Sequence, residues 1–296
     1  MSILADKNTK IMVQGITGTQ ASFHVGRAIE YGTNVVCGVT PGKSGIVHLG
    51  VPVFDNVKEA VKETGAEVSV LFVPANAVKS AITEAVDAEL KLVVCITDSV
   101  PVRDMLEIRN ILRGSQTKLI GPNTPGVIVP DEVKLGIFPE NIHHRGHIGV
   151  VSRSSTLTYE AVLETNRAGM GQSAVVGLGD DMIIGSSFVD MLQFFHEDKD
   201  THAIVMVGSL GGRFEEQGAA WYEAQTMRKP VICYIAGSDT TFCRHVGYAG
   251  DIITHGRITV AGKKKILSDA GMIVVDNINQ IHQELLSILT NAETID

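Results

Sequence analysis

Near the start of the chain, glycines and threonines follow a short apolar run in a pattern typical of phosphate sites. Residues 11–13 read Ile-Met-Val, and residues 15–20 read Gly-Ile-Thr-Gly-Thr-Gln before an amphipathic stretch. We therefore predict a strand that turns on glycines into the N-terminus of a helix. Glycine lets the backbone come close to an anion, and the first helical N–H groups and the positive end of the helix dipole face that anion.

The same stretch differs from the pattern of a dinucleotide site. Gly15 and Gly18 are spaced Gly-x-x-Gly, and a dinucleotide site also needs an acidic residue after the second strand to hold the ribose. The second predicted strand runs instead into Gly-Val-Thr-Pro-Gly-Lys at residues 38–43, without a carboxylate. Lys43 suits a further phosphate, so a phosphorylated nucleotide other than NAD fits better than the cofactor of a dehydrogenase. Spacing alone equally allows a solvated loop lysine.

The elements around this turn predict a parallel α/β domain. Continuous apolar strands that alternate with amphipathic helices are typical of a doubly wound sheet, whose ligands bind at the carboxyl ends of the strands. The predicted strands cover residues 11–14, 34–39, 68–73, 92–96 and 118–120. The predicted helices cover residues 19–30, 57–64, 76–88 and 101–113. Residues 126–146 are rich in glycine, proline and polar side chains, which predicts an interdomain linker.

The alternation then restarts and predicts a second α/β domain, flavodoxin-like in its number of elements. The predicted strands cover residues 148–151, 173–176, 203–207, 231–235 and 272–275. The predicted helices cover residues 157–167, 188–195, 214–226, 262–269 and 278–289. The first strand-to-helix turn, residues 151–157, is dense in hydroxyl groups and is a candidate anion site. The alternative is an ordinary Ser/Thr helix cap.

Composition excludes several functional classes. The chain has 296 residues and a net charge of −8, which argues against nucleic acid as the main partner because phosphate backbones require basic surface. No apolar run approaches the ~20 residues of a membrane span, and the N-terminus lacks the apolar core of a signal peptide. The four cysteines have no zinc-type spacing, so we expect reduced thiols, no metal site and a cytoplasmic (cytosolic or organelle-matrix) protein.

Several motifs together resemble the α subunit of succinyl-CoA synthetase, also called succinate–CoA ligase. They run nearly end to end in one register: Met1-Ser2-Ile3-Leu4, residues 15–24, residues 38–43, Gly121-Pro122-Asn123, residues 152–160 and Gly211-Gly212. The resemblance implies a Rossmann-like CoA-binding domain, expected at residues 1–125, and a flavodoxin-like ligase domain, expected at residues 147–296. Residues 126–146 would connect them.

The resemblance also implies a chemistry and a partner. In this family a carboxylate and a nucleoside triphosphate give an acyl phosphate, a histidine of the α subunit carries the phosphoryl group, and the CoA thiol captures the acyl group. ATP or GTP with Mg²⁺ binds to a separate ATP-grasp β subunit, so we expect a heterodimer or heterotetramer that acts on a small carboxylic acid.

The CoA site of the family carries over position by position. Four residues match its phosphate-holding turn: Thr17, Gly18, Thr19 and Gln20. Lys43 matches its CoA-binding lysine. Ile96 and Thr97 match the next CoA-contacting segment, and Asp98 stands where an acidic residue is common. Tyr159 matches a tyrosine near the substrate and the subunit interface.

The phosphohistidine site departs from the family. Tyr248 stands where the phosphorylated histidine is expected, and Ser209 stands where a glutamate orients that histidine. Ser154 and Ser155 fall in the family's phosphate-binding Ser-Gly-Thr segment. A phenol with a pKa near ~10 is a poor phosphoryl carrier, so we read these changes as altered or lost chemistry.

Three hypotheses follow from this departure. A neighbouring histidine, His245 or His255, takes over the phosphoryl transfer. Alternatively, the enzyme transfers the acyl group from an acyl phosphate to CoA or to another acceptor, such as an amine, without any phosphohistidine. In the third hypothesis the chain is a CoA-binding pseudoenzyme that regulates a true ligase.

Overall fold

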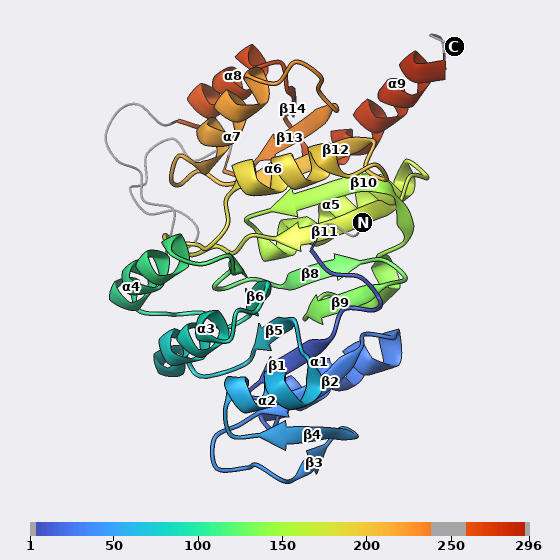
Figure 1. Cartoon of the computed structure of the whole chain (residues 1–296). Coiled ribbons are helices and arrows are strands. Elements are labelled where there is room, and N and C mark those ends of the chain that lie inside the picture. The colour runs from blue at the N-terminus through green and yellow to red at the C-terminus, as the bar shows by residue number, and fades with distance from the viewer. Residues whose placement is uncertain (1–3, 238–258, 294–296) are drawn as a thin grey trace. The chain divides into compact units, whose positions relative to one another are not determined.

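The structure, a computed structural model, describes residues 4–237 and 259–293 and divides into two units (Figure 1). Unit 1 comprises the described residues up to Glu140 together with Ile183–Ser186. Unit 2 comprises Asn141–Met182 and the described residues from Ser187 onward. Both units have the predicted α/β class, with sheets that are mostly parallel.

The sheet of unit 1 has the strand order β3-β4-β2-β1-β5-β6-β7. Its strands are β1 (Ile11–Gln14), β2 (Val35–Val39), β3 (Val47–His48), β4 (Val51–Phe54), β5 (Val68–Leu71), β6 (Leu92–Cys95) and β7 (Lys118–Ile120). Without β3, the order is that of the Rossmann fold, in which the chain first builds to one side of β1 and then returns to the other. The reversal point therefore lies between β1 and β5.

One edge of this sheet corrects the expectation of purely parallel pairing. β3 pairs with β4 in antiparallel register. Only residues 49 and 50 join the two strands, and both have positive φ, 52° and 80°. Such a two-residue turn matches the twist of a hairpin, which a two-residue strand with little apolar pattern does not reveal in the sequence.

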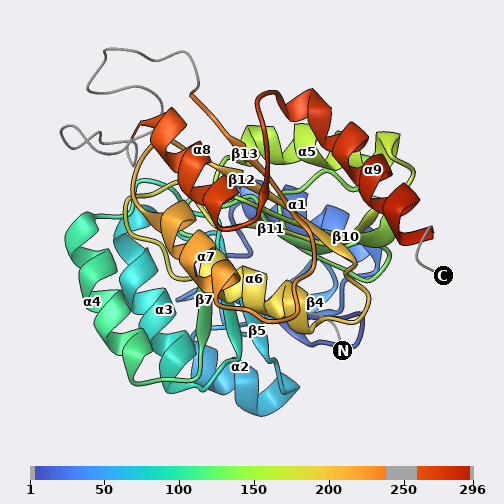
Figure 2. The ribbon, with the colours of Figure 1, turned by 90° about the horizontal axis from the view of Figure 1, so that it is seen from above.

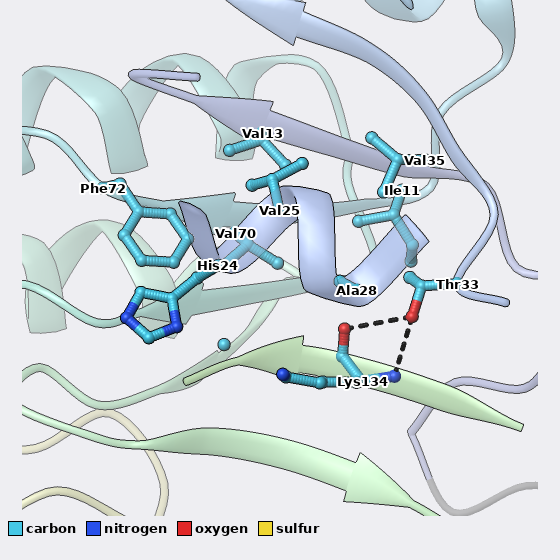
Figure 3. A pocket seen from close by; sticks show the side chains of 11 residues that line it. Ile11, Val13, His24, Val25, Ala28, Thr33, Val35, Val70, Phe72 and Lys134 are labelled. Carbon is cyan, nitrogen blue, oxygen red and sulfur yellow. Dashed lines mark hydrogen bonds between the residues drawn. The ribbon is translucent and has the colours of Figure 1, made fainter. Parts of the chain in front are cut away.

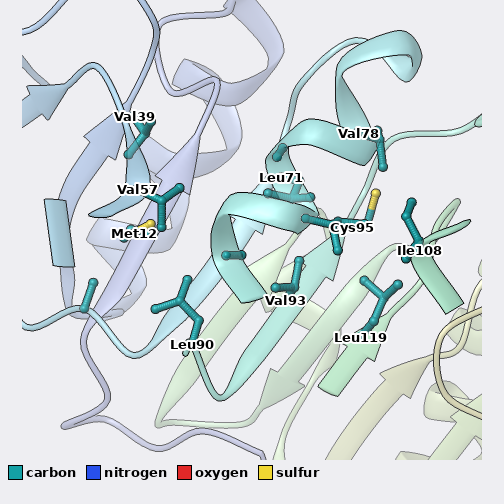
Figure 4. Packing of buried hydrophobic residues seen from close by; sticks show 14 of the residues in the cluster. Met12, Val39, Val57, Leu71, Val78, Leu90, Val93, Cys95, Ile108 and Leu119 are labelled. Atoms are coloured by element: carbon teal, nitrogen blue, oxygen red, sulfur yellow. The ribbon is translucent and has the colours of Figure 1, made fainter. Parts of the chain in front are cut away.

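Helices cover both faces of this sheet. They are α1 (Thr19–Tyr31), α2 (Val57–Thr64), α3 (Val78–Asp87) and α4 (Val102–Arg113), with a short 3₁₀ turn η1 (Ala75–Ala77) before α3. Figure 4 shows the core between the sheet and α2, α3 and α4, where Met12, Leu71 and Val93 from the strands meet Val78 and Ile108 from the helices. All five side chains are at least 99% buried, as the continuous apolar runs predict.

The segment expected to be a linker contains regular structure. Residues 126–146 include the antiparallel hairpin of β8 (Gly126–Val129) and β9 (Val133–Gly136) and the 3₁₀ turn η2 (Glu140–Ile142). Gly126 is one of the residues that suggested a linker. Close packing requires glycine there, because a Cβ on Gly126 would lie 1.9 Å from the carbonyl oxygen of Leu135. The units divide after Glu140.

A second part of unit 1 comes from much later in the chain. Ile183–Ser186 belongs to the connection that follows β11 of unit 2. Gly185 N donates to the carbonyl of Gly121 at 2.8 Å, and Ser186 Oγ donates to the carbonyl of Leu119 in β7 at 2.7 Å. Nothing in the sequence pattern predicts this return.

Within unit 2, five parallel strands have the order β11-β10-β12-β13-β14. They are β10 (Arg145–Ser152), β11 (Gln172–Gly177), β12 (Ala203–Gly208), β13 (Val231–Ile235) and β14 (Ile273–Val275). This order is that of flavodoxin-like folds, whose reversal point lies between the first and third strands. Here those strands are β10 and β12.

The helices of unit 2 lie beside one another in two sets (Figure 2). α5 (Ser155–Arg167) packs with α9 (Ile281–Glu293), which follows the 3₁₀ turn η3 (Ile278–Gln280). α7 (Phe214–Glu223) packs with both α6 (Phe188–Glu197) and α8 (Val260–Asp269). No helix among the described residues combines the length and apolar composition needed to cross a membrane.

Candidate functional site

The first candidate site is the turn between β1 and α1. Gly15 has φ +81°, and a Cβ there would lie 2.7 Å from the carbonyl oxygen of Phe72, so the turn requires glycine. Gly18 is the N-cap of α1 and supplies no side-chain hydrogen bond to the first turn. Thr19 and Gln20 are exposed. The helix N-terminus therefore presents N–H groups to solvent at the reversal point of the sheet, which is the arrangement that binds phosphate.

The structure brings Lys43 to this turn. Its Nζ donates a hydrogen bond to Thr17 Oγ1 at 3.2 Å, and Thr17 Oγ1 lies 3.4 Å from Thr40 Oγ1. The lysine loop is held by Asp55, whose Oδ1 accepts hydrogen bonds from the backbone N of Lys43 and of Ser44 at 3.0 and 2.9 Å. An ammonium group thus lies beside the uncapped helix N-terminus, where both attract an anion.

The third predicted CoA segment lies farther along the same sheet edge. Ile96, Thr97 and Asp98 follow β6, which is two strands from β1. Thr97 Oγ1 donates to the carbonyl of Val73 at 2.6 Å, which fixes its hydroxyl to the neighbouring strand end. Asp98 is exposed. The structure therefore places these residues at the same carboxyl edge as Lys43, without bringing them into contact with it among the described interactions.

In unit 2 the turn between β10 and α5 holds the next candidates. Ser154 is the N-cap of α5, and its Oγ accepts a hydrogen bond from Leu157 N at 3.4 Å. The turn is tightened by Ser152 Oγ, which accepts from Ser154 N at 3.0 Å. Ser154 therefore caps α5, which is one of the two roles that the sequence left open, and the anion site stays a prediction. Ser155 and Tyr159 are half-buried, and burial raises the pKa of the Tyr159 phenol.

Ser209 lies at the carboxyl end of β12, across the reversal point from Ser154. Its Oγ accepts a hydrogen bond from Arg153 Nη1 at 3.2 Å, and its backbone N donates to Glu215 Oε1 at 2.9 Å. Glu215 Oε2 in turn lies 2.6 Å from Lys263 Nζ, and both of these side chains are fully buried. Arg153 lies within a motif that the sequence singled out, whereas no pattern in the sequence pointed to Lys263.

Two predicted catalytic residues, Tyr248 and His245, lie outside the described residues. His255 and Cys243 lie outside them as well. The three described cysteines, Cys37, Cys95 and Cys233, are buried and unbridged. Burial raises the pKa of Cys37 and of Cys233, which keeps both thiols protonated and unreactive.

A separate small pocket lies beside α1 (Figure 3). Its lining is mostly apolar, but Lys134 and His24 also face it. Burial and the nearby Lys134 lower the pKa of His24. Lys134 Nζ donates to Glu140 Oε2 at 2.8 Å. Of the described residues, none of those predicted to bind CoA lines this pocket.

Known proteins match both units. Residues 6–99 match the CoA binding domain family, and residues 151–280 match the CoA-ligase family. The chain is 49% identical over 292 residues to the α subunit of the ADP-forming succinate–CoA ligase of Staphylococcus epidermidis, covering 99% of this chain and 96% of that one. Identity to the corresponding subunit of Staphylococcus aureus is 48%, with the same coverage.

Two solved structures share the fold at lower identity. The ATP citrate lyase of Methanothrix soehngenii, in complex with citrate and coenzyme A, aligns with a TM-score of 0.86 at 20% identity. It covers 98% of this chain, which spans 51% of that one. The dinucleotide-forming acetyl-coenzyme A synthetase 1 of Candidatus Korarchaeum cryptofilum aligns with a TM-score of 0.72 at 19% identity over 93% of this chain and 59% of that one.

The two family matches, one on the Rossmann-like unit and one on the flavodoxin-like unit, identify a CoA-binding ligase subunit. More specifically, the chain belongs to the α-subunit family of succinate–CoA ligase.

Proposed function

We propose that this chain is the α subunit of a nucleotide-dependent carboxylate–CoA ligase, and that unit 1 binds CoA at the turn between β1 and α1. One observation carries the proposal: the uncapped N-terminus of α1, the hydroxyl of Thr17 and the ammonium of Lys43 converge at the reversal point of a Rossmann-like sheet. All three groups attract the phosphates of a nucleotide, and no carboxylate follows β2 to hold the ribose of NAD.

The other predicted residues have separate tasks in this proposal. Thr19 and Gln20 offer backbone N–H groups to phosphate, and Gly18 closes the turn, because its N–H donates to the carbonyl of Gly15 at 3.0 Å. Ile96, Thr97 and Asp98 line the sheet edge along which the rest of CoA extends. Bound CoA supplies the thiol that captures the activated acyl group. Ser155 and the N-terminus of α5 hold the phosphoryl group, and Tyr159 lies near the carboxylate substrate.

The proposed partner is an ATP-grasp β subunit that binds ATP or GTP with Mg²⁺. The family membership of the chain supports this partner, because the relatives are α subunits by name. The substrate is a small carboxylic acid. We place the complex in the cytoplasm and expect no nucleic acid partner, given the net charge of −8.

The phosphoryl carrier is the open part of the mechanism. Tyr248 occupies the position at which the family carries a phosphohistidine, and Ser209 occupies that of the orienting glutamate. We propose that the relay is altered, either moved to His245 or bypassed by direct transfer of the acyl group from the acyl phosphate to CoA or another acceptor, which releases inorganic phosphate. A CoA-binding pseudoenzyme is the remaining alternative.

The CoA site is tested by calorimetric titration of the chain with CoA. We expect Lys43→Met to weaken CoA binding by about tenfold, the equivalent of about 1.4 kcal/mol. The matched control is Lys58→Met, since Lys58 is an exposed lysine of α2 in the same unit and its loss leaves the affinity unchanged. Equal affinities for the two variants would refute the proposed site.

The relay is tested on the chain co-expressed with an ATP-grasp partner. Labelled ATP that phosphorylates the chain, and fails to do so after His245→Ala, indicates a relocated relay. Thioester formation without any phosphoenzyme indicates the bypass. CoA binding without turnover in any pairing indicates the pseudoenzyme.

A further inference from the structure

His24 ends the sequence motif that opens with Gly15, and the proposed phosphate contacts leave it without a task. It lies in the second turn of α1 and is half-buried. Its ring is nearly parallel to that of Phe72, with 6.2 Å between the ring centroids and 8° between the planes (Figure 3). This is the geometry of an offset stack. A side chain of α1 thus packs on the residue that directly follows β5.

Phe72 belongs to a strand end that joins two of the predicted CoA segments. Its backbone N donates to the carbonyl of Gln14 at 3.0 Å, and its carbonyl oxygen would lie 2.7 Å from a Cβ on Gly15. The carbonyl of the next residue, Val73, accepts a hydrogen bond from Thr97 Oγ1 at 2.6 Å. Residues 72 and 73 therefore lie between the phosphate-type turn and Thr97, so a displacement of Phe72 reaches both.

The surroundings of His24 oppose a charge on its ring. The ring lines the small pocket beside α1 together with Lys134, whose side chain is buried (Figure 3). Burial and then the Lys134 ammonium lower the pKa of His24. Glu140 acts in the opposite sense, but its carboxylate is engaged by Lys134 Nζ at 2.8 Å and by Arg27. The ring is therefore neutral at neutral pH.

Other titratable side chains of α1 and its neighbours are engaged elsewhere. His48 Nε2, in β3, lies 2.7 Å from Ser22 Oγ. Tyr31 Oη accepts a hydrogen bond from the backbone N of Asp131 at 2.8 Å. Neither contact brings a carboxylate to the His24 ring, so a protonated ring is better solvated in water than in the pocket.

We propose that His24 is a positioning residue of the CoA site: its neutral ring holds Phe72 against the turn before α1, and a proton on the ring releases Phe72. This role rests on the proposed function, because the site that it regulates is the CoA site of unit 1. A charged ring leaves the pocket, since burial and Lys134 both oppose it there. CoA binding therefore favours the neutral ring, and the affinity for CoA declines as the pH falls through the pKa of His24 in the free chain.

The test compares the CoA affinity of the full chain with that of His24→Gln between pH 5 and pH 8, the range in which histidine titrates. CoA loses phosphate charge toward acid pH, which affects both proteins equally, so the ratio of the two affinities isolates the ring. We expect the unmodified chain to bind CoA more tightly at the upper end of this range. Toward the lower end it should lose about threefold of this advantage, which corresponds to a pKa of His24 that is about 0.5 lower in the CoA-bound chain.

Two further variants sharpen the test. Lys134→Met removes the ammonium that opposes protonation, and Glu140 keeps its pair with Arg27. We expect the titration of the His24 ring, followed by nuclear magnetic resonance and assigned by its loss in His24→Gln, to move to higher pH together with the decline in CoA affinity. The matched control is His196→Gln, a half-buried histidine of α6 in unit 2, which should leave the pH profile of CoA binding unchanged.

A merely structural His24 would change the CoA affinity by the same factor at every pH. Such a constant ratio, with CoA binding intact, would overturn the role of His24 and leave the proposed function standing. A ratio that rises toward acid pH would overturn it as well, because the ring would then act as a charge that attracts the CoA phosphates. If the unmodified chain fails to bind CoA at any pH, both the proposed function and the role of His24 fail.

Discussion

Two strand-to-helix turns, one in each unit, lie at the reversal points of their sheets but are built differently. The turn before α1 has a glycine N-cap without a side-chain bond, exposed residues at positions 18–20, and a lysine on a surface loop. The turn before α5 has a serine cap and a fully buried arginine. An exposed turn admits a large ligand that keeps most of its bulk outside. In the second turn Arg153 and Ser154 are buried, whereas Ser155 is half-buried.

The comparison also separates binding from stability. The cation of the first turn is exposed, and its removal costs little folding free energy. Arg153 of the second turn and Lys263 of α8 belong to one buried network, since both donate hydrogen bonds to Ser209 and Gly211. Substitution of the exposed Lys43 should therefore change affinity more than stability, and substitution of the buried Lys263 should do the reverse.

The largest expected effect is that of Lys263→Met. It leaves Glu215 buried without its ion-pair partner, so we expect the free energy of unfolding to fall by about 3–5 kcal/mol, measured by denaturant unfolding. The double variant Lys263→Met/Glu215→Gln should recover most of this loss, because the amide oxygen still accepts from Ser209 N. If Lys263→Met alone lowers the free energy of unfolding by less than about 0.5 kcal/mol, the range of surface substitutions, the proposed difference in stability between the two regions is wrong.

Gly15→Ala comes next. Its φ of +81° and the 2.7 Å approach of the Phe72 oxygen predict a cost of about 1–3 kcal/mol, together with loss of CoA affinity because the turn must shift. Gly26→Ala is the control, since a Cβ there meets nothing within 4 Å and alanine stabilises a helix interior by about 1 kcal/mol. Thermal unfolding and CoA titration of the pair measure both effects; a Gly15→Ala protein with normal CoA affinity contradicts the prediction.

A smaller effect is expected at Asp55, which positions the lysine loop without touching the turn itself. Asp55→Ala removes the acceptor of two backbone N–H hydrogen bonds. Each such bond stabilises the loop by about 0.5–1.5 kcal/mol, unless water replaces the lost acceptor. We expect a weakening of CoA binding by about threefold, less than for Lys43→Met. Asp55→Asn keeps an acceptor oxygen and should restore most of the affinity, so equal losses for both variants would argue against the positioning role.

The smallest effect is expected at the amino-terminal ends of β10 and β12, the two strands on either side of the reversal point of unit 2. The rings of His147, early in β10, and His202, just before β12, stack at 4.3 Å between centroids. Partial desolvation and the neighbouring His147 lower the pKa of His202, although its side chain is exposed. The unfolded chain therefore binds protons more readily, and stability should decline slightly as the pH falls below 6.5.

His202→Gln should flatten this dependence in unfolding experiments between pH 5 and pH 8, the range in which histidine titrates, and leave CoA and phosphate binding unchanged. An unaltered pH profile would show that the stacked pair is not its source.

The sequence predicted the sheets well because their strands are continuous apolar runs. The predicted strands at residues 11–14 and 118–120 coincide with β1 and β7. The hairpin β8–β9 was missed since its glycines suggested a loop, whereas Gly126 is required by close packing against β9. The antiparallel β3 was missed because two residues carry no periodic signal.

The sequence predicted which site residues lie close together only where they are near one another in the chain or where the fold class fixes which strands are neighbours. Thr17 and Lys43 are close because β1 and β2 are neighbours in a Rossmann-like order, which the alternation of elements implies. Their binding roles stay predictions. The network of Arg153, Ser209 and Lys263 joins residues that are 56 and 54 positions apart. From the sequence alone, a charged residue that is buried in the fold cannot be distinguished from one on the surface.

The return of Ile183–Ser186 to β7 has a consequence for synthesis. A chain made from its N-terminus has completed every strand of the unit 1 sheet long before Ser186 exists, because the hydrogen bond from Ser186 to Leu119 spans 67 positions. The hydrogen bond to the Leu119 carbonyl can form only after β10 and β11 of the other unit have been synthesised. The hydrogen bonds that Gly185 and Ser186 donate to unit 1 therefore form only after the first two strands of the other unit have been synthesised.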